Sequence, residues 1–496
     1  MGKDMIDLLV VGGGTAGIVG AQTAASLGAR TLLVERARTG GDCLWTGCVP
    51  SKTLLAAASD AARLRRHTGA PVDFDRVRER VRSAIAAIEP VDSPAALEAA
   101  GVGVLLGNLR FTGPGRAEVD GRPVAFRQAL IATGAAPADP GIPGLDPGRT
   151  VTSETVWDLA RLPRRLAVVG GGPVACELGQ AFARLGSEVT LIVRSGLLPA
   201  EDPDAVDVLR EALVADGLRI LEHAVVRAAE VEGSGDVEGS ASPVDGAVRL
   251  RLGDGTAVDA DVVLLATGRV PRTAGLGLDA LGVGLDEAGR VATDTRLRTS
   301  VPTVWAAGDV TSRPRHTHSA GIDASLAASN AVLGLRRRVD DAIPRVTFTS
   351  PEIAAVGART GARRHGSPAG PVSERTVAHT HVDRAITDGD TRGFTRLALG
   401  RGGRILGGTI VGARAGESLG ELCLAVRHRH TTADVFQAMH PYPTHSDGVW
   451  NAAIADVRDR LAKPPLAALT RGLAAVRRAR LDRTRRKPVG LDSAPR

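Results

Sequence analysis

The stretch DLLVVGGGTAG, residues 7–17, decides the fold, because an apolar strand runs directly into a glycine-rich turn. A helical pattern follows, and a second apolar strand at residues 31–34 ends at Glu35. GxGxxG spacing lets a backbone approach a pyrophosphate at a helix N-terminus, and three glycines supply it: Gly12, Gly14 and Gly17. A carboxylate placed like that of Glu35 can hold ribose hydroxyls. We therefore expect a dinucleotide-binding unit here.

A second strand, turn and helix follow in the same order from residue 166 onward. The residues of this turn are Gly170, Gly172 and Ala175, and a later strand at 189–193 ends before Arg194. Val193 stands where an acid would bind a ribose 2′-hydroxyl, whereas the guanidinium of Arg194 suits a 2′-phosphate. The pattern favours NADPH, with NADH as the alternative cofactor and a solvated surface arginine as the alternative role of Arg194.

The rest of the chain predicts a third domain of a different kind. From residue 344 to about 462 the glycine turns stop, and alternating segments at 394–399 and 405–411 indicate an antiparallel sheet with helices. The stretch GSGDVEGSASPVDGA, residues 232–246, is typical of a flexible hairpin loop or insertion. A length of 496 residues also fits three domains, at roughly 150 residues each.

Charge and cysteine content exclude several classes of protein. The formal net charge of +7 lies in the tail, since residues 463–496 contain ten Lys and Arg against two Asp. The near-neutral body therefore does not indicate a nucleic-acid-binding protein. Four cysteines are too few for a disulfide framework in so long a chain. The start lacks a basic leader and no apolar run is long enough to span a membrane, so we expect a cytoplasmic protein.

The chemistry is concentrated in GGDCLWTGCVPSK, residues 40–52. Cys43 and Cys48 have four residues between them on a glycine-punctuated turn, and a helix beginning near Pro50 would stabilise a thiolate at Cys48. Zinc would need two further ligands, and neither Cys176 nor Cys423 lies in a paired motif, so we predict no metal site. A redox-active pair is the interpretation that remains.

This motif resembles the active-site sequence of the class I pyridine nucleotide-disulfide oxidoreductases, of the glutathione reductase and lipoamide dehydrogenase type. The resemblance extends from about residue 5 to residue 455. It implies an α/β fold with two Rossmann-like nucleotide-binding domains, for FAD and NAD(P), plus a C-terminal α+β dimerisation domain. The implied boundaries are 1–150 and 271–340 for the FAD domain, 151–270 for the NAD(P) domain, 341–462 for the dimerisation domain and 463–496 for a basic tail.

The resemblance also implies roles for single residues. Electrons would pass from NADPH through FAD to the Cys43–Cys48 disulfide, with Cys48 as the thiolate beside the flavin and Cys43 as the interchange thiol. Lys52, one of four lysines in the chain, would pair with Glu177 near the flavin. Further cofactor-binding residues are implied at the strand ends ATG and ATGR and in the motif TVWAAGD: Thr133, Gly134, Gly268 and Asp309.

The sequence departs from disulfide-reducing members of the family near residue 442. Those members carry a His and, five residues later, a Glu, which the partner subunit offers to the interchange cysteine. This chain has Tyr442 and Asp447 there, and tyrosine, with a reference pKa of roughly 10, is a poor proton shuttle at neutral pH. His440 and His445 are alternative bases. Mercuric reductases also carry tyrosine at this place, so the chain resembles mercuric reductase-like members most.

The electron acceptor stays open on the sequence. Mercuric reductases generally end in a vicinal cysteine pair, whereas this sequence ends in LDSAPR. Mercuric ion or another thiophilic metal, lipoamide or another disulfide, and a quinone are the candidate acceptors for a homodimeric reductase. A hypothesis of a different class is a flavin-binding module that its basic tail, with apolar and arginine residues alternating over 466–487, attaches to a membrane or nucleic acid.

Overall fold

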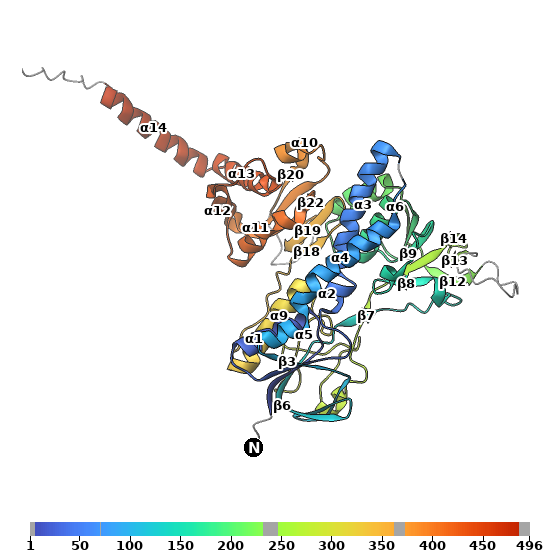
Figure 1. Ribbon diagram of the computed structural model, residues 1–496. Helices are drawn as coiled ribbons and strands as arrows, with labels where there is room; N and C mark the ends of the chain where they lie inside the picture. The colour runs from blue at the N-terminus through green and yellow to red at the C-terminus, as the bar shows by residue number, and fades with distance from the viewer. Residues whose placement is uncertain (1–4, 70, 232–246, 362–372, 486–496) are drawn as a thin grey trace, which may run out of the picture. The chain divides into compact units, whose positions relative to one another are not determined.

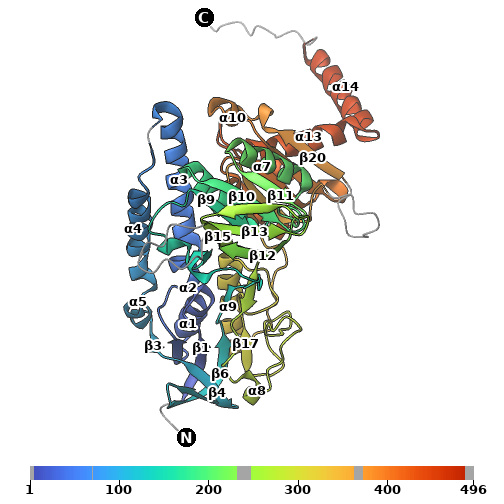
Figure 2. The same cartoon turned by 90° about the vertical axis from the view of Figure 1, so that its right-hand side faces the viewer.

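The computed structural model describes residues 5–69, 71–231, 247–361 and 373–485, and the chain divides into two compact units between Pro351 and Glu352 (Figures 1 and 2). The predicted loop at 232–246 and the last eleven residues lie outside the described ranges.

The first unit begins with the sheet that the opening motif predicts. Its parallel strands lie in the order β3-β2-β1-β6, with β17 beside β6, and their ranges are Val102–Leu106, Thr31–Glu35, Ile6–Val11, Arg122–Ile131 and Val304–Ala306. Residues 304–306 thus return to the N-terminal sheet from far along the chain. Leu8 and Val10 are buried on one face and Leu9 and Val11 on the other, as expected of a central parallel strand.

Helices and a small antiparallel extension complete this part of the unit. Helix α1 (Thr15–Ser26) packs against α9 (Thr317–Leu333) on one face of the sheet. Strands β4 (Leu109–Gly113) and β5 (Arg116–Val119) extend the sheet from β6 in antiparallel fashion, and α8 spans Leu278–Leu281. Four helices follow β2 in the chain: α2 (Gly41–Trp45), α3 (Cys48–Thr68), α4 (Phe74–Asp92) and α5 (Pro94–Ala99).

A second parallel sheet occupies the middle of the chain. Its strand order is β11-β10-β9-β15-β8, with the ranges Arg219–Glu222, Glu188–Val193, Arg165–Val169, Val262–Leu265 and Thr150–Thr152. Helices α6 (Pro173–Leu185) and α7 (Pro203–Ala215) follow β9 and β10. Figure 1 shows α6 lying beside α3, which packs against it. This contact places the cysteine-bearing helix next to the second nucleotide-binding unit.

Smaller elements link these two sheets. An antiparallel sheet contains β12 (Val226–Val231), β13 (Val248–Leu252) and β14 (Ala257–Ala260), and a two-stranded ribbon contains β7 (Ala135–Pro137) and β16 (Arg269–Pro271). The single-turn helices η1 (Pro147–Arg149) and η2 (Val156–Asp158) lie between β7 and β9, and β18 spans Arg345–Thr347.

The second unit is an antiparallel sheet covered by helices. Strands β19 (Glu352–Gly357), β22 (Ile405–Gly412), β21 (Phe394–Leu399) and β20 (Ser373–Ala378) pair in that order. Helix α11 (Ala415–Arg427) packs on β19 and β22, and α13 (Asp447–Ala462) packs on β20 and β21. The remaining elements are η3 (His379–His381), α10 (Asp383–Thr387), η4 (Arg401–Gly403), α12 (Thr432–Gln437) and the exposed α14 (Leu466–Arg485).

The predicted fold class is confirmed, with two parallel α/β sheets followed by an antiparallel α+β unit. One detail differs, since the helix expected near Pro50 already begins at Cys48 because Gly47 acts as its N-cap. Across the described ranges, the helices all fall short of the length and apolarity that crossing a membrane requires.

Candidate active site

Two glycines bring the cysteine-bearing segment against the first nucleotide-binding turn. Gly40 and Gly41 have φ angles of 102° and 57°, and the Gly40 N–H donates to the Gly13 carbonyl at 2.8 Å. A Cβ atom on Gly41 would lie 2.5 Å from the Cα of Gly14. Because only glycine tolerates both the angle and this approach, the sequence fixes α2 directly against the turn.

Cys43 lies within α2 and Cys48 is the first residue of α3, and both are half-buried free thiols. Their side chains hydrogen-bond to each other. The hydrogen bond from Cys43, the Thr317 hydroxyl and the Lys52 ammonium lower the pKa of Cys48 to about 6 despite its burial. The same hydrogen bond and burial raise the pKa of Cys43. The pair therefore holds a thiolate at Cys48 and a thiol at Cys43 at neutral pH.

Thr317 is a contact of this pair that the sequence did not reveal. Its hydroxyl oxygen lies 3.1 Å from the Cys48 sulfur, and it is the first residue of α9. Since 269 residues separate Thr317 from Cys48, no local pattern links them. The hydroxyl can donate to the thiolate, which favours the charged form.

Lys52 and Glu177 form the predicted ion pair one helical turn beyond Cys48. The Lys52 Nζ atom donates to Glu177 Oε2 at 2.9 Å and lies 4.3 Å from the centre of the Phe348 ring. The Glu177 side chain is only 7% exposed, and its other oxygen accepts from the Phe348 N–H at 2.9 Å. A buried carboxylate held at both oxygens fixes the position of the ammonium.

The first nucleotide-binding turn has the shape that a pyrophosphate needs. Gly12 has a φ of 107°, and Cβ atoms on Gly12 and Gly17 would meet main-chain oxygens at 2.4 and 1.8 Å. Gly14 is the N-cap of α1, where no side chain caps the first N–H groups. Glu35 Oε2 accepts from the Gly13 N–H at 2.6 Å. An open helix N-terminus beside a carboxylate suits a nucleotide with a pyrophosphate and a ribose.

Two adjoining cavities extend from this turn. The larger, of about 330 Å³, contains Thr133, Gly134, Asp309 and Cys43 in its lining, and the smaller, of about 210 Å³, lies along Glu35 and Gly107. Gly12, Glu35 and Thr133 line both cavities. Cys43 and Glu35, the predicted ribose-binding residue, thus line one cleft, as a dinucleotide with its reactive ring beside the sulfur would require.

A group of charged side chains crosses the larger cavity, and sequence reasoning missed most of it. Burial raises the pKa of Asp309, and Arg269, whose Nε lies 3.8 Å from its carboxylate, opposes this effect. Arg269 also contacts Asp42 and lies 3.6 Å from Glu154, which pairs with Arg272 at 2.7 Å. Arg269 directly follows the predicted Gly268, whose φ is 131°. The strand-end motif ATGR predicted a cofactor-binding residue at Gly268, but it did not indicate the ion pairs of the neighbouring Arg269.

The second nucleotide-binding turn repeats the geometry of the first. Gly170 has a φ of 143°, and a Cβ atom there would lie 2.3 Å from the Ala266 carbonyl oxygen. Gly172 is the N-cap of α6, again without a side-chain cap, and Ala175 is fully buried. Arg194 follows β10 directly and is exposed, so its guanidinium can reach a ligand from solvent.

The predicted Tyr442 and Asp447 pair lies in the second unit and makes other contacts there. Tyr442 is 72% exposed, and its hydroxyl donates to Asp383, which raises its pKa. Asp447 is the buried first residue of α13 and accepts from the N–H and hydroxyl of Thr444 at 3.2 and 3.1 Å. Within this unit the Asp447 carboxylate therefore holds the preceding Thr444 against the start of α13, and Tyr442 remains accessible.

The two alternative histidines are each paired with a carboxylate. His440 Nε2 lies 2.7 Å from Glu421 Oε1 and its Nδ1 lies 2.9 Å from the Ala438 carbonyl oxygen. Burial lowers the pKa of His440, but its hydrogen bonds with Glu421 and Ala438 raise the pKa by more, so the net effect is an increase above its usual value. His445 Nε2 lies 3.0 Å from Asp388 Oδ2. Among the described residues, no group of three or more His, Cys, Asp or Glu side chains could hold a metal ion.

Comparisons with known proteins agree with this geometry. Residues 6–324 match the model of the pyridine nucleotide-disulphide oxidoreductase family, and residues 343–453 match the model of its dimerisation domain, which supports a homodimer. A mercuric reductase of Acidithiobacillus ferrooxidans is 36% identical over 92% of this chain and 83% of its own length. A dihydrolipoyl dehydrogenase of Thermus scotoductus is 35% identical over 90% of this chain and 97% of its own length.

Solved structures show the same fold. LpdA from Mycobacterium tuberculosis has a TM-score of 0.82 and 29% identity, with 91% of this chain and 99% of that chain covered. The HOCl-induced flavoprotein disulfide reductase RclA from Escherichia coli has a TM-score of 0.79 and 26% identity, with 90% and 99% covered. This chain therefore belongs to the pyridine nucleotide-disulphide oxidoreductase family, and it is an FAD-dependent oxidoreductase of a family that uses NAD(P)H.

Proposed function

We propose that this protein is an NADPH-dependent reductase that passes electrons through FAD to the Cys43–Cys48 disulfide and on to mercuric ion or another thiophilic metal. The observation that carries the proposal is the thiol pair, in which a thiolate at Cys48 lies in hydrogen-bonding contact with a protonated Cys43. Two contacting sulfurs can close a disulfide when oxidised and take up two electrons when reduced. We place this reductase, as a homodimer, in the cytoplasm, where such a pair can be kept reduced.

Residues of this chain would bind both cofactors and position the reacting groups. FAD, when bound, supplies a two-electron carrier between the nicotinamide and the disulfide. The turn at Gly12 would hold its pyrophosphate, Glu35 its ribose and Asp309 its ribityl chain, within a domain made of residues 1–150 and 271–340. Residues 151–270 would bind NADPH, with Arg194 on the 2′-phosphate. Lys52, held by Glu177, would keep positive charge beside Cys48 and the flavin.

The proton balance favours a metal ion as the acceptor. Reduction of divalent mercury to the metal takes up two electrons and no proton, whereas reduction of a disulfide to two thiols also takes up two protons. His440 faces a hydrogen-bond acceptor at each ring nitrogen, so only its doubly protonated form satisfies both. In that form the ring has no lone pair with which to deprotonate the Cys43 thiol for attack on a substrate disulfide, and the exposed phenol of Tyr442 is a weak base.

A disulfide such as lipoamide is the second candidate acceptor, and the dihydrolipoyl dehydrogenase of Thermus scotoductus favours it. It would require His440 or His445 to leave its carboxylate and act as a base during turnover. A quinone that takes electrons directly from the flavin is the third, because it needs neither cysteine.

Anaerobic titration of the FAD-loaded protein with NADPH tests the proposal. We expect uptake of four electrons per chain in the wild type and of two in a Cys43→Ser variant. Assays with mercuric ion, lipoamide and a quinone then separate the acceptors, since only quinone reduction should survive Cys43→Ser. Cys423→Ser, a half-buried cysteine in the second unit, is the matched control. Uptake of only two electrons by the wild type would refute the thiol–flavin assignment.

A further inference from the structure

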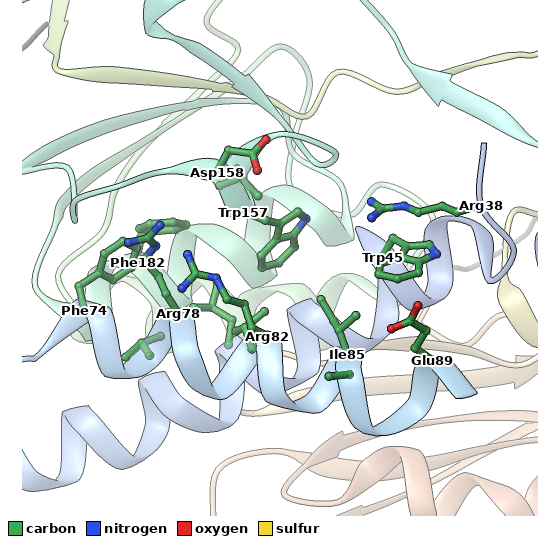
Figure 3. Close-up of a pocket in the computed structure, with 15 residues that line it drawn as sticks. Arg38, Trp45, Phe74, Arg78, Arg82, Ile85, Glu89, Trp157, Asp158 and Phe182 are labelled. Atoms are coloured by element: carbon green, nitrogen blue, oxygen red, sulfur yellow. The ribbon is translucent and has the colours of Figure 1, made fainter. Parts of the chain in front are cut away.

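A cavity of about 460 Å³ lies on the first unit, outside the cleft described above (Figure 3). Helix α4 forms one side, and the other sides come from α2, α3, η2 and α6. This volume lies within the range of about 300–1,000 Å³ typical of small-molecule sites. The proposed reaction uses none of the residues that line it.

The walls are aromatic in a chain with few aromatic residues. The chain has four Trp and seven Phe, and two of each line this cavity: Trp45, Trp157, Phe74 and Phe182. Both indole N–H groups already donate to main-chain carbonyls, Trp45 to Thr39 at 2.7 Å and Trp157 to Ser153 at 2.9 Å. The rings therefore offer the cavity apolar faces, which favour a flat apolar ligand.

Charged side chains surround these rings. The Arg38 guanidinium lies 3.8 Å from the centre of the Trp45 ring, and Arg82 extends from α4 toward Trp157 (Figure 3). Arg78 donates to Asp75 at 3.0 Å, but its Nε is buried and has no hydrogen-bond partner among the described residues. A buried donor without a partner is costly, and an anionic oxygen in the cavity would satisfy it.

Carboxylates near the cavity limit the negative charge that a ligand can carry. Glu89 and Asp158 also line the cavity, and the guanidinium groups of Arg78 and Arg82 lie 3.0 Å from Asp75 and 3.7 Å from Glu79. The buried Arg78 Nε therefore suits a ligand with a single anionic group, and the carboxylates around it disfavour a polyphosphate. A planar aromatic ring system with one carboxylate, sulfonate or ionised hydroxyl group matches both the walls and the charge.

The cavity is connected to the cysteine loop by two side chains. Trp45 belongs to the same five-residue helix as Cys43 and lines the flavin cleft as well as this cavity. Trp157 Nε1 also donates at 3.0 Å to the carbonyl of Thr46, which lies between the two cysteines. A ligand stacked on these rings would therefore press on the segment that sets the distance between the sulfurs.

We propose that this cavity binds a planar aromatic monoanion and that the bound ligand acts on the cysteine loop through Trp157. Ligand binding at this cavity is independent of the proposed function. Only the effect of the ligand on the loop rests on the proposal that Cys43 and Cys48 are the redox pair. By linkage, a ligand that alters the loop must itself bind differently when the loop changes between dithiol and disulfide.

Isothermal titration calorimetry of the FAD-loaded full-length protein with 2-naphthoate tests the binding. We expect one saturable site per chain and, from the loss of one charge-assisted hydrogen bond, binding weaker by about tenfold or more in Arg78→Met. The neutral 2-naphthamide should bind correspondingly less well, and Ile85→Trp, which fills the cavity, should abolish binding. Arg80→Met, on the exposed side of α4, is the matched control. Equal binding of 2-naphthoate by wild type and Ile85→Trp, or its absence from both, would overturn the proposal.

Alkylation of the reduced protein by iodoacetamide tests the coupling. Saturating 2-naphthoate should change the alkylation rate of Cys48 a few fold in the wild type, not at all in Ile85→Trp, and less in Trp157→Phe, which keeps an aromatic wall but cannot donate to Thr46. An unchanged rate in the wild type would remove the coupling. No NADPH is present in either experiment, so a protein that binds 2-naphthoate without oxidising NADPH would contradict the proposed function and leave this site in place.

Discussion

Replacement of Cys43 by alanine should raise the pKa of Cys48, because it removes the largest of the interactions that stabilise the thiolate. A hydrogen bond to a charged acceptor contributes about 1.5–3 kcal/mol, and one pKa unit corresponds to about 1.4 kcal/mol. The pKa of Cys48 should therefore rise from about 6 in the wild type. The expected value in Cys43→Ala is about 7 to 8. Ultraviolet absorbance of the thiolate, followed against pH in the reduced protein, measures the change.

Cys43→Ser is the matched control, because the serine hydroxyl can still donate to the sulfur. Its thiolate should titrate close to the wild-type value. The other cysteines do not interfere, since burial raises the pKa of Cys176 to about 12 and raises that of Cys423 as well. If the alanine and serine variants titrate alike, the hydrogen bond between the cysteines is not what stabilises the thiolate, and the reasoning fails.

Four further predictions concern other parts of the chain. Arg194→Ala should raise KM for NADPH about tenfold or more while KM for NADH changes little, as steady-state kinetics with both nucleotides would show. Lys52→Met should destabilise the first unit by about 1–2 kcal/mol in urea unfolding, because it leaves the buried Glu177 carboxylate without its cation, and added Glu177→Gln should restore most of the loss. Burial lowers the pKa of His379 from 6.5 to about 4, so the stability that the neutral ring provides is complete above pH 6.5 and is lost as pH falls toward 4. This loss amounts to up to about 3 kcal/mol of unfolding free energy, and in His379→Gln the unfolding free energy should depend less on pH, as unfolding experiments at several pH values would show. Deletion of residues 466–496 should leave NADPH oxidation unchanged while any binding to anionic vesicles or DNA is lost; slower turnover would mean that the exposed α14 contributes to the reaction.

Much of the fold could be predicted from the sequence because its signals are local. The glycine turns at residues 12–17 and 170–175 carry their own conformational requirements, and each stands between a strand and a helix that periodicity reveals. The antiparallel pairing of β21 with β22 follows from alternation in the same way. The helix begins at Cys48, two residues before the predicted start near Pro50, since its N-cap is a glycine and carries no side-chain signal.

The site was predicted only where a motif marks it. Lys52 and Glu177 lie 125 residues apart, and the family motif alone suggested their pairing, which the ion pair at 2.9 Å now shows. The chain returns to earlier parts of the fold and so brings three further residues to the candidate site: Thr317, Arg269 and Glu154. The spacing of residues in the sequence contains no information on such long-range contacts. Tyr442 and His440 lie in a unit whose side chains have local partners, and those partners could not be read from the sequence.

The contact between Gly41 and Gly14 has a consequence for anyone who redesigns this protein. The loop for the nucleotide and the loop for the sulfurs fit together with no space for even one methyl group, so neither can be transplanted alone from a distant homologue. A chimera with its crossover between residues 17 and 40 would join two surfaces that were never matched. Grafts of this redox centre into other scaffolds should therefore move residues 12–52 as a single cassette.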